Sequence, residues 1–157
     1  MKRIKQLQPL SKEHHQSLVL AQTAIKISNS QNAESISTLC KKIVDEYPAV
    51  WMVHFQIEEE NIFQVLEDRP NGANTDHQQH EREVTQLCKK LRQEHLTMNH
   101  YYEQIRSGDY SLLAKFGELL KQHTRTEERQ LFPLLDKFLN QEELDKIYQT
   151  SLAYRQI

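Results

Sequence analysis

The chain has 157 residues and a nearly balanced charge, with 20 lysines and arginines against 22 aspartates and glutamates and a formal net charge of −2. We expect a single domain over residues 1–157, and the balanced charge offers no basic stripe for a nucleic-acid partner. The longest apolar run, 49–53, is far shorter than the roughly 18 residues of a membrane span, and no signal-peptide core follows Met1. We therefore expect a cytoplasmic protein without a membrane partner.

The first predicted helix begins with a cap at Ser11 and ends near residue 28, because apolar residues recur at helical spacing between these points. Residues 1–9 are polar and end in a proline, which predicts an arm on the surface. A second amphipathic stretch follows the cap residue Asn32. Pro48 lies inside this stretch and lacks a backbone donor, so we expect two pieces, about 33–47 and 48–67.

Two further helices complete the pattern, one from about residue 75 to a cap at Gly108 and one over about 112–138. Only three glycines and four prolines punctuate the chain, as in an all-helical protein with few connections. These features predict an all-α, up-down-up-down four-helix bundle over about 10–139, with a short extra C-terminal helix over about 141–155.

One phrase occurs twice, as HFQIEEENIF over 54–63 and as HTRTEERQLF over 123–132. A histidine, two glutamates and an aliphatic residue followed by phenylalanine recur at the same offset of 69 positions. Residues four apart on a helix share one face, about 5–6 Å from each other, so each phrase aims an imidazole and a carboxylate in one direction. Two such helices facing each other would form a metal site.

The candidate ligands are the polar residues on the buried helix faces: His14 or His15, His54, Glu58, His80, His123 and Glu127. A fifth imidazole could come from His77 or from the second member of the His14–His15 pair. Burying carboxylates without a partner costs several kcal/mol, and no Lys or Arg lies in the apolar stripes beside them, so cations explain them best. Imidazole with carboxylate suits iron, manganese or zinc. We interpret His95, His100, Glu59 and Glu128 as solvated or hydrogen-bonded residues rather than ligands.

The chain resembles the hemerythrin-like, HHE-type cation-binding domains over nearly its whole length. The residues that carry the resemblance are Leu10-Ser11-Lys12-Glu13-His14-His15 with Leu18, His54-Phe55 with Glu58-Glu59, His80 with Val84, and His123 with Glu127-Glu128 and Leu131-Phe132-Pro133. The resemblance implies a non-haem centre of two irons per chain, bridged by Glu58 and Glu127, with histidine ligands from all four helices. Members of this family bind dioxygen or nitric oxide, sense iron or redox state, or handle iron.

Two spacings differ from those of the oxygen-carrying hemerythrins. Those proteins have His-x-x-x-His on the third helix, where this chain has His77-x-x-His80, and their last carboxylate follows its histidine by five residues rather than four. The second difference argues against a dedicated oxygen carrier. On the first helix the family spacing favours His15 as the ligand, whereas the local helical period favours His14.

The leading hypothesis is a di-iron protein that binds or senses a small ligand such as dioxygen, nitric oxide or peroxide. The alternative is a regulatory or iron-handling module in which the metal is structural and a partner protein reads its state. A ferritin-like oxidase is disfavoured, because that fold uses Glu-x-x-His and both phrases here place the histidine first at a spacing of four. The pattern therefore assigns no enzymatic activity.

Overall fold

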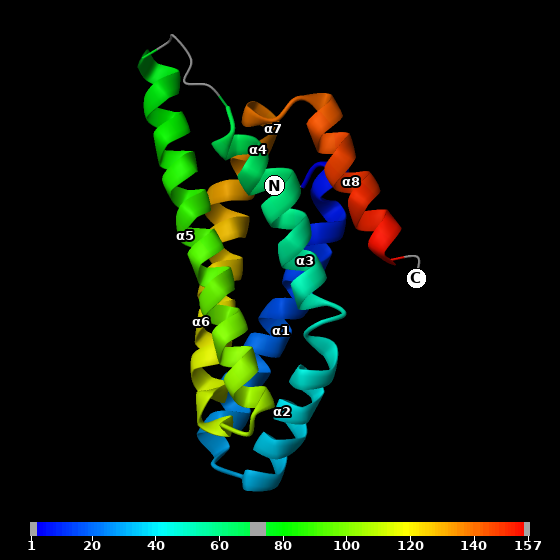
Figure 1. Ribbon diagram of the computed structural model, residues 1–157, viewed down its shortest axis with the longest axis vertical. Helices are drawn as coiled ribbons and strands as arrows, with labels where there is room; N and C mark the ends of the chain where they lie inside the picture. Colours follow the sequence, from blue (N-terminus) through cyan, green and yellow to red (C-terminus); the bar gives the residue numbers. More distant parts are fainter. Residues whose placement is uncertain (1–2, 70–74, 156–157) are drawn as a thin grey trace.

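The computed structural model describes residues 3–69 and 75–155, and side chains over 3–69 and 81–154; these residues form helices and turns without a strand (Figure 1). Four rods run alternately up and down along the long axis, which confirms the predicted all-α bundle. The rods are α1 (Gln8–Ser30), α2 (Ala33–Glu46) continued by α3 (Trp51–Glu58), α5 (Thr75–Arg106), and α6 (Leu113–Thr126) with its extensions. A final helix, α8 (Gln141–Arg155), packs outside them beside α1 and α3.

The first rod begins earlier than predicted. A single 3₁₀ turn, η1 (Lys5–Leu7), leads directly into α1 at Gln8, so Ser11 lies inside the helix rather than at its cap. Pro9 lies in the first helical turn, where its missing N–H would have no partner in any case. Lys5 and Gln8 are exposed but Leu7 is fully buried, so the described residues 3–9 lie on the surface of the bundle with one side chain inserted in its core.

The second rod breaks at Pro48, as predicted. Residues 47–50 form a turn between α2 and α3, and the amides of Trp51 and Met52 both donate to the Tyr47 carbonyl at 3.0 Å. The side chain of Asn32 caps α2 by accepting a hydrogen bond from the Ser35 amide at 2.9 Å. The break allows the second rod to keep packing against the bundle along both of its pieces.

Both rods that carry the repeated phrase change to a π-helical turn, and the two turns begin within one residue of the same point of the phrase. These turns are η2 (Glu59–Phe63) and η4 (Glu127–Leu131). After η2 the chain continues as α4 (Gln64–Glu67), and after η4 as the 3₁₀ turn η5 (Phe132–Leu134) and α7 (Leu135–Phe138). Because π turns are rare and are frequent at functional sites, their nearly equivalent positions mark this level of the bundle as a candidate site.

Two apolar clusters fill the bundle, one at each end. One cluster includes Leu10, Ile62 and Leu131, and the other includes Ala21 and Phe116. Along each long rod, the residues between the two clusters include the buried histidines and glutamates described below. The polar residues therefore form a layer between two apolar layers.

The close approach of α1 and α6 requires a glycine. A Cβ on Gly117 would lie 2.9 Å from the Ala21 carbonyl oxygen, so only glycine permits this spacing. Nearby, the hydroxyls of Ser17 and Thr124 lie 2.8 Å apart in the same buried interface. This contact aligns α1 and α6 along the bundle axis, so that His14 lies at the same level as the second phrase.

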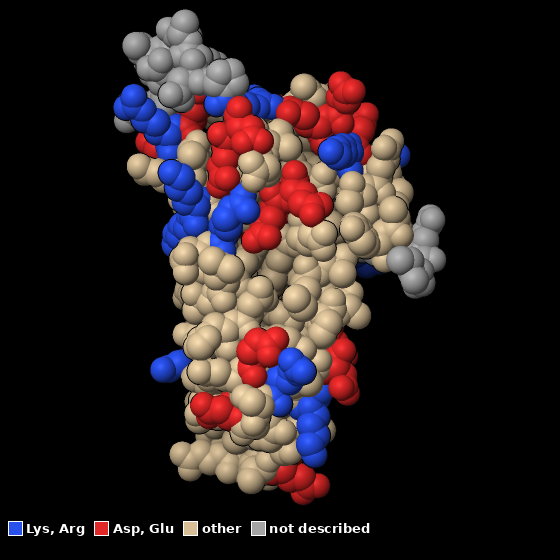
Figure 2. All heavy atoms as spheres, in the orientation of Figure 1, with Lys and Arg blue, Asp and Glu red and all other residues tan. Residues whose placement is uncertain are grey.

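On the face shown in Figure 2, charged side chains of both signs gather toward the two ends of the molecule. Between them a band over the lower part of α3 and the lower half of α5 in this view carries few charges. Among the described helices, none combines the length and the apolar character that crossing a membrane requires.

Candidate metal centre

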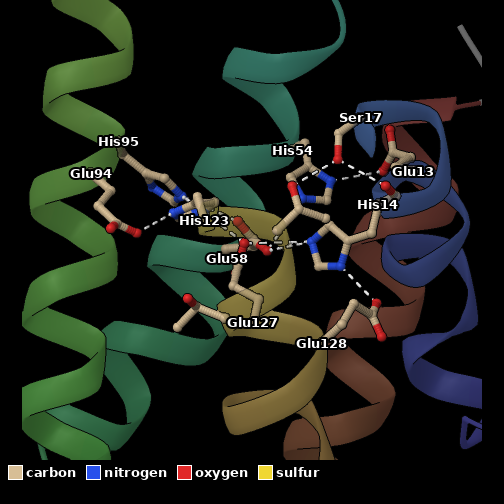
Figure 3. A network of polar contacts seen from close by, with 12 residues as sticks. Glu13, His14, Ser17, His54, Glu58, Glu94, His95, His123, Glu127 and Glu128 are labelled. Carbon is tan, nitrogen blue, oxygen red and sulfur yellow. Dashed lines mark hydrogen bonds and ion pairs between the residues drawn. The ribbon is translucent and has the colours of Figure 1, made fainter. Parts of the chain in front are cut away.

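Six buried side chains meet in the polar layer, and they form two groups that share a pair of glutamates (Figure 3). Within each group, one potential ligand atom from every residue lies within 4.8 Å of the others. The groups are His14, His54, Glu58 and Glu127, and Glu58, His95, His123 and Glu127. We call Glu58 and Glu127 the inner carboxylates; both are fully buried.

Each of the four imidazoles turns its Nε2 atom toward the inner carboxylates. The Nε2–oxygen distances are 3.2 Å from His14 and from His54 to Glu58 Oε2, 3.3 Å from His95 to Glu58 Oε1, and 2.7 Å from His123 to Glu127 Oε1. His14 Nε2 also lies 3.5 Å from Glu127 Oε1, so it approaches both inner carboxylates. Four nitrogens and four carboxylate oxygens thus converge on one small volume.

The opposite ring nitrogen, Nδ1, of each imidazole is bound by a second set of glutamates. The pairs are His14 with Glu128 at 2.7 Å, His54 with Glu13 at 3.2 Å, His95 with Glu59 at 3.2 Å and His123 with Glu94 at 3.0 Å. We call these four glutamates the outer carboxylates. A carboxylate that accepts from Nδ1–H fixes the tautomer and leaves the Nε2 lone pair directed at a cation, which is the usual environment of a metal-binding histidine.

The outer contacts repeat with an approximate two-fold pattern between the two halves of the chain. Each half has a Glu-His pair on one rod (13–14 and 94–95) and a His-x-x-x-Glu-Glu phrase on the next (54–59 and 123–128). In each half the glutamate of the pair binds the histidine of the phrase. The last glutamate of each phrase binds the histidine of the other half's pair. The two groups of the cluster therefore have nearly equivalent surroundings.

The inner carboxylates provide a test of whether these residues suit a metal. Within the described residues, Glu58 Oε1 and both oxygens of Glu127 have no hydrogen-bond donor in suitable geometry, although imidazole nitrogens lie close to them. Atoms that lie this close without directing a hydrogen at one another are arranged as ligands around a common centre. Leaving such oxygens buried without a partner costs at least about 1–3 kcal/mol each, so the residues present fit a bound cation.

A protein-family model described as the Hemerythrin HHE cation binding domain matches residues 7–135. The chain belongs to this family. Searches of curated proteins and of solved structures found no match. The matched segment contains all six buried side chains of the cluster, so the family assignment and the geometry both point to cation binding by this HHE domain.

The carboxylates of the cluster raise the pKa of its buried imidazoles. Burial alone would lower the pKa of His14, but the neighbouring carboxylates of Glu127, Glu128 and Glu58 raise it well above the ordinary value. Burial also acts to lower the pKa of His123, but Glu127 and Glu94 outweigh burial and raise this pKa to about 10. Because an imidazole must be deprotonated at the nitrogen that binds a metal, a cation in this cluster competes with protons for these nitrogens.

Aromatic rings close the cluster from the side. Phe55 stacks on the His95 ring with centroids 4.1 Å apart and an interplanar angle of 23°. Phe132 packs against His14 with centroids 4.9 Å apart. These contacts hold the imidazole planes in place and keep bulk water away from the Nε2 side.

The structure brings only one histidine of the 14–15 pair into the cluster. His14 is 2% exposed and belongs to the cluster, whereas His15, one residue further round the helix, is exposed to solvent. Because Pro9 starts the helix early, His14 falls on the same buried face as Leu10 and Ser17, and His15 is rotated away by about 100°.

On the third rod the cluster histidine is His95, which sequence analysis set aside as an ordinary residue. Its position was readable, because His95 lies four residues after Leu91 and three before Met98 on one buried face, and a glutamate precedes it as one precedes His14. The predicted ligands His77 and His80 have side chains outside the described residues. They lie four to five turns before His95 on the same helix.

Glu59 and Glu128 are hydrogen-bonded to histidines of the cluster, one of the two environments expected for them from the sequence. Both are only partly exposed, at 32% and 24% for the side chain, and each binds the Nδ1 atom of a cluster histidine from another rod. A rotation of about 100° from the buried face allows a helix contact or solvent, and it does not say which histidine such a side chain reaches. A long glutamate side chain at such a position reaches the neighbouring helix.

Proposed function

We propose that this HHE domain holds two iron ions, one beside His14 and His54 and one beside His95 and His123, with Glu58 and Glu127 bridging them. A single observation supports the proposal best. All four Nε2 atoms turn toward the inner carboxylates, while all four Nδ1 atoms are held by the outer carboxylates. A merely structural network of ion pairs gives no reason for the same orientation four times.

The donor set favours a first-row transition metal. Imidazole nitrogen and carboxylate oxygen suit iron, manganese or zinc, and the metal-capable groups among the described residues include no thiolate. Two inner and four outer carboxylates bring up to six negative charges to the centre, which multiply charged cations offset. Among these metals we propose iron, because the resemblance to hemerythrin-like domains implies it.

The number of ligands leaves room for a guest. Two six-coordinate ions need about twelve positions, and four imidazoles with two bridging carboxylates supply about eight. The remaining positions are open to solvent and to a small external ligand such as dioxygen, nitric oxide or peroxide. The aromatic rings of Phe55 and Phe132 beside the imidazoles favour a small neutral guest over a large or charged one. We therefore propose that the centre binds or senses such a ligand.

A second candidate function is regulatory, with a structural metal whose presence a partner protein reads. One observation favours this function: Arg3, in the N-terminal segment, donates hydrogen bonds to the outer carboxylate Glu128. Loss of the metal would then alter the packing of the chain ends, where α8 exposes Leu152 and Tyr154.

One experiment separates the two functions. Protein purified from iron-replete cells is analysed for iron, and its optical spectrum is followed when the reduced form meets dioxygen or nitric oxide and when the oxidised form meets azide. We expect about two irons per chain and a spectral change with at least one ligand. Two irons without any response would favour the regulatory function, and zinc alone or a single ion would contradict the bridged pair.

A further inference from the structure

The approximate two-fold pattern of the centre is broken at one outer carboxylate. Glu128 binds His14 Nδ1 through Oε1 at 2.7 Å, and its other oxygen accepts a hydrogen bond from Arg3 Nη2, also at 2.7 Å. The same guanidinium nitrogen donates to the Glu128 backbone carbonyl at 2.8 Å. In the described part of the chain, the half of the centre that contains His95 and His123 has no such contact. Its outer carboxylates, Glu59 and Glu94, form no ion pair with an arginine or lysine among the described residues.

Arg3 is itself held in place from several sides. Its carbonyl accepts a hydrogen bond from the Gln8 side chain at 3.2 Å, and its guanidinium lies 6.0 Å from the centre of the Phe132 ring. Its side chain is 22% exposed, so this is a partly buried contact rather than a free surface pair. The guanidinium thus fixes both the side chain and the main chain of Glu128.

The C-terminal helix supports the segment that carries Arg3. The Gln6 side chain donates to Asp145 on α8 at 3.1 Å, and the Lys5 ammonium lies 5.5 Å from the centre of the Tyr148 ring. Leu7 is fully buried in the same apolar cluster as residues of α8. A continuous series of contacts therefore leads from α8 through the N-terminal segment to a histidine of the centre.

These contacts lie mostly outside the part of the chain that the family shares. The family model matches residues 7–135, which leaves out Arg3, Gln6 and all of α8. The cluster and its four outer carboxylates lie inside the match. The difference between the two halves of the centre thus comes from residues that the family pattern does not include.

We propose that Arg3 is a positioning residue of the metal centre, which acts through Glu128 on His14 and selectively retains the cation beside His14 and His54. This inference rests on the proposed function. The guanidinium stops the Glu128 carboxylate from rotating, so Oε1 stays on Nδ1 and the imidazole keeps Nε2 directed at the cation. Without Arg3 the carboxylate can turn to solvent, and the imidazole can tilt away with it.

The test measures the release of iron from each half of the centre. Protein loaded anaerobically with ferrous iron is mixed with the chromogenic chelator ferrozine, and the time course is compared between wild type and Arg3→Gln. We expect half of the iron to leave about three- to tenfold faster and the other half to keep the wild-type rate. This change is smaller than the 10- to 100-fold loss typical when a direct partner of a ligand is removed. Arg3→Lys should be intermediate, because the ammonium keeps the charge but is a point charge on a flexible stem, without the planar group that lies against the Phe132 ring.

Arg92→Gln is the matched control. Arg92 pairs with Glu67 at 3.0 Å and lies 6.0 Å from the centre of the Phe63 ring, which is the counterpart of Phe132 in the first phrase. Glu67 binds no cluster histidine, so this variant should release iron at the wild-type rate. Asp145→Ala, which loosens the N-terminal segment from α8, should accelerate the same half as Arg3→Gln by a smaller factor.

Three outcomes would overturn the inference: equal acceleration of both halves in Arg3→Gln, unchanged or slower release in that variant, or an equal effect of Arg92→Gln. If wild-type protein takes up no ferrous iron, the proposed function fails and the inference fails with it. Uptake of two irons with no effect of Arg3→Gln removes the inference alone.

Discussion

The Nε2 atoms of His95 and His123 lie 3.1 Å apart, and each ring has its Nδ1 on a different glutamate, Glu59 or Glu94. If both Nδ1–H groups donate, the two Nε2 lone pairs face each other. Only a shared positive charge, either a proton or a metal cation, makes that arrangement favourable. The inner carboxylate oxygens beside them favour the cation, because a proton between the rings would leave those oxygens without a donor.

The first prediction compares neighbouring histidines on α1. His14→Gln should lose at least one of the two cations and destabilise the metal-free protein by about 1–3 kcal/mol, because buried carboxylates lose their partner. His15→Gln should keep both cations and change stability by less than about 0.5 kcal/mol, because His15 is exposed. Elemental analysis and thermal melts check the pair. Equal metal loss in both variants would contradict the rotation of α1 that buries His14 and exposes His15.

The second prediction concerns the third rod. His95→Gln should lose the cation that His95 shares with His123, whereas His100→Gln should not, because His100 lies on the exposed face of α5. Both residues are in the same helix, so a general effect of substituting a histidine there would appear in both. Metal content per chain is the measurement, and retention of two cations by His95→Gln would show that this imidazole is no ligand.

The general architecture could be predicted from the sequence because it depends on periodic patterns. The repeated phrase placed His54, Glu58, His123 and Glu127 on facing rods, and the broken helix at Pro48 followed from the chemistry of proline. His95 was missed because its phrase is shorter. A single Glu-His pair on a buried face lacks the doubled spacing that made the other positions conspicuous.

The remaining differences arise from contacts between segments distant in sequence. The arm around Arg3 contains few apolar residues, yet it is held by Glu128, 125 positions away. The outer carboxylates reach histidines on other rods, and the two π turns leave no mark in the hydrophobic period. Helical periodicity describes one helix at a time, so it predicts neither contacts between distant segments nor π turns.

The third prediction concerns pH. Burial would lower the pKa of His123, but Glu127 and Glu94 raise it to about 10. Because this folded-state pKa is above the ordinary value near 6.5, its contribution to the stability of the metal-free protein is complete below about pH 6.5 and is lost as pH rises through about 10. The melting temperature of the metal-free protein should therefore fall between pH 7 and 10, and less so in His123→Gln.

The same protonation makes cation binding depend on pH in the opposite sense. Burial also works against protonation of His14 and His54, but the pKa of each is nevertheless raised by the neighbouring glutamates, so cations must displace protons from several imidazoles. Calorimetric titration in two buffers of different ionisation enthalpy should show net proton release near pH 7. Apparent affinity that rises as pH is lowered would contradict this sign.

The most direct test of the central claim is anomalous diffraction at the iron edge from crystals of the iron-loaded protein. We predict two peaks per chain, both against Glu58 and Glu127, with one beside His14 and His54 and the other beside His95 and His123. A single peak, or peaks that lie away from the inner carboxylates, would contradict the bridged pair of cations.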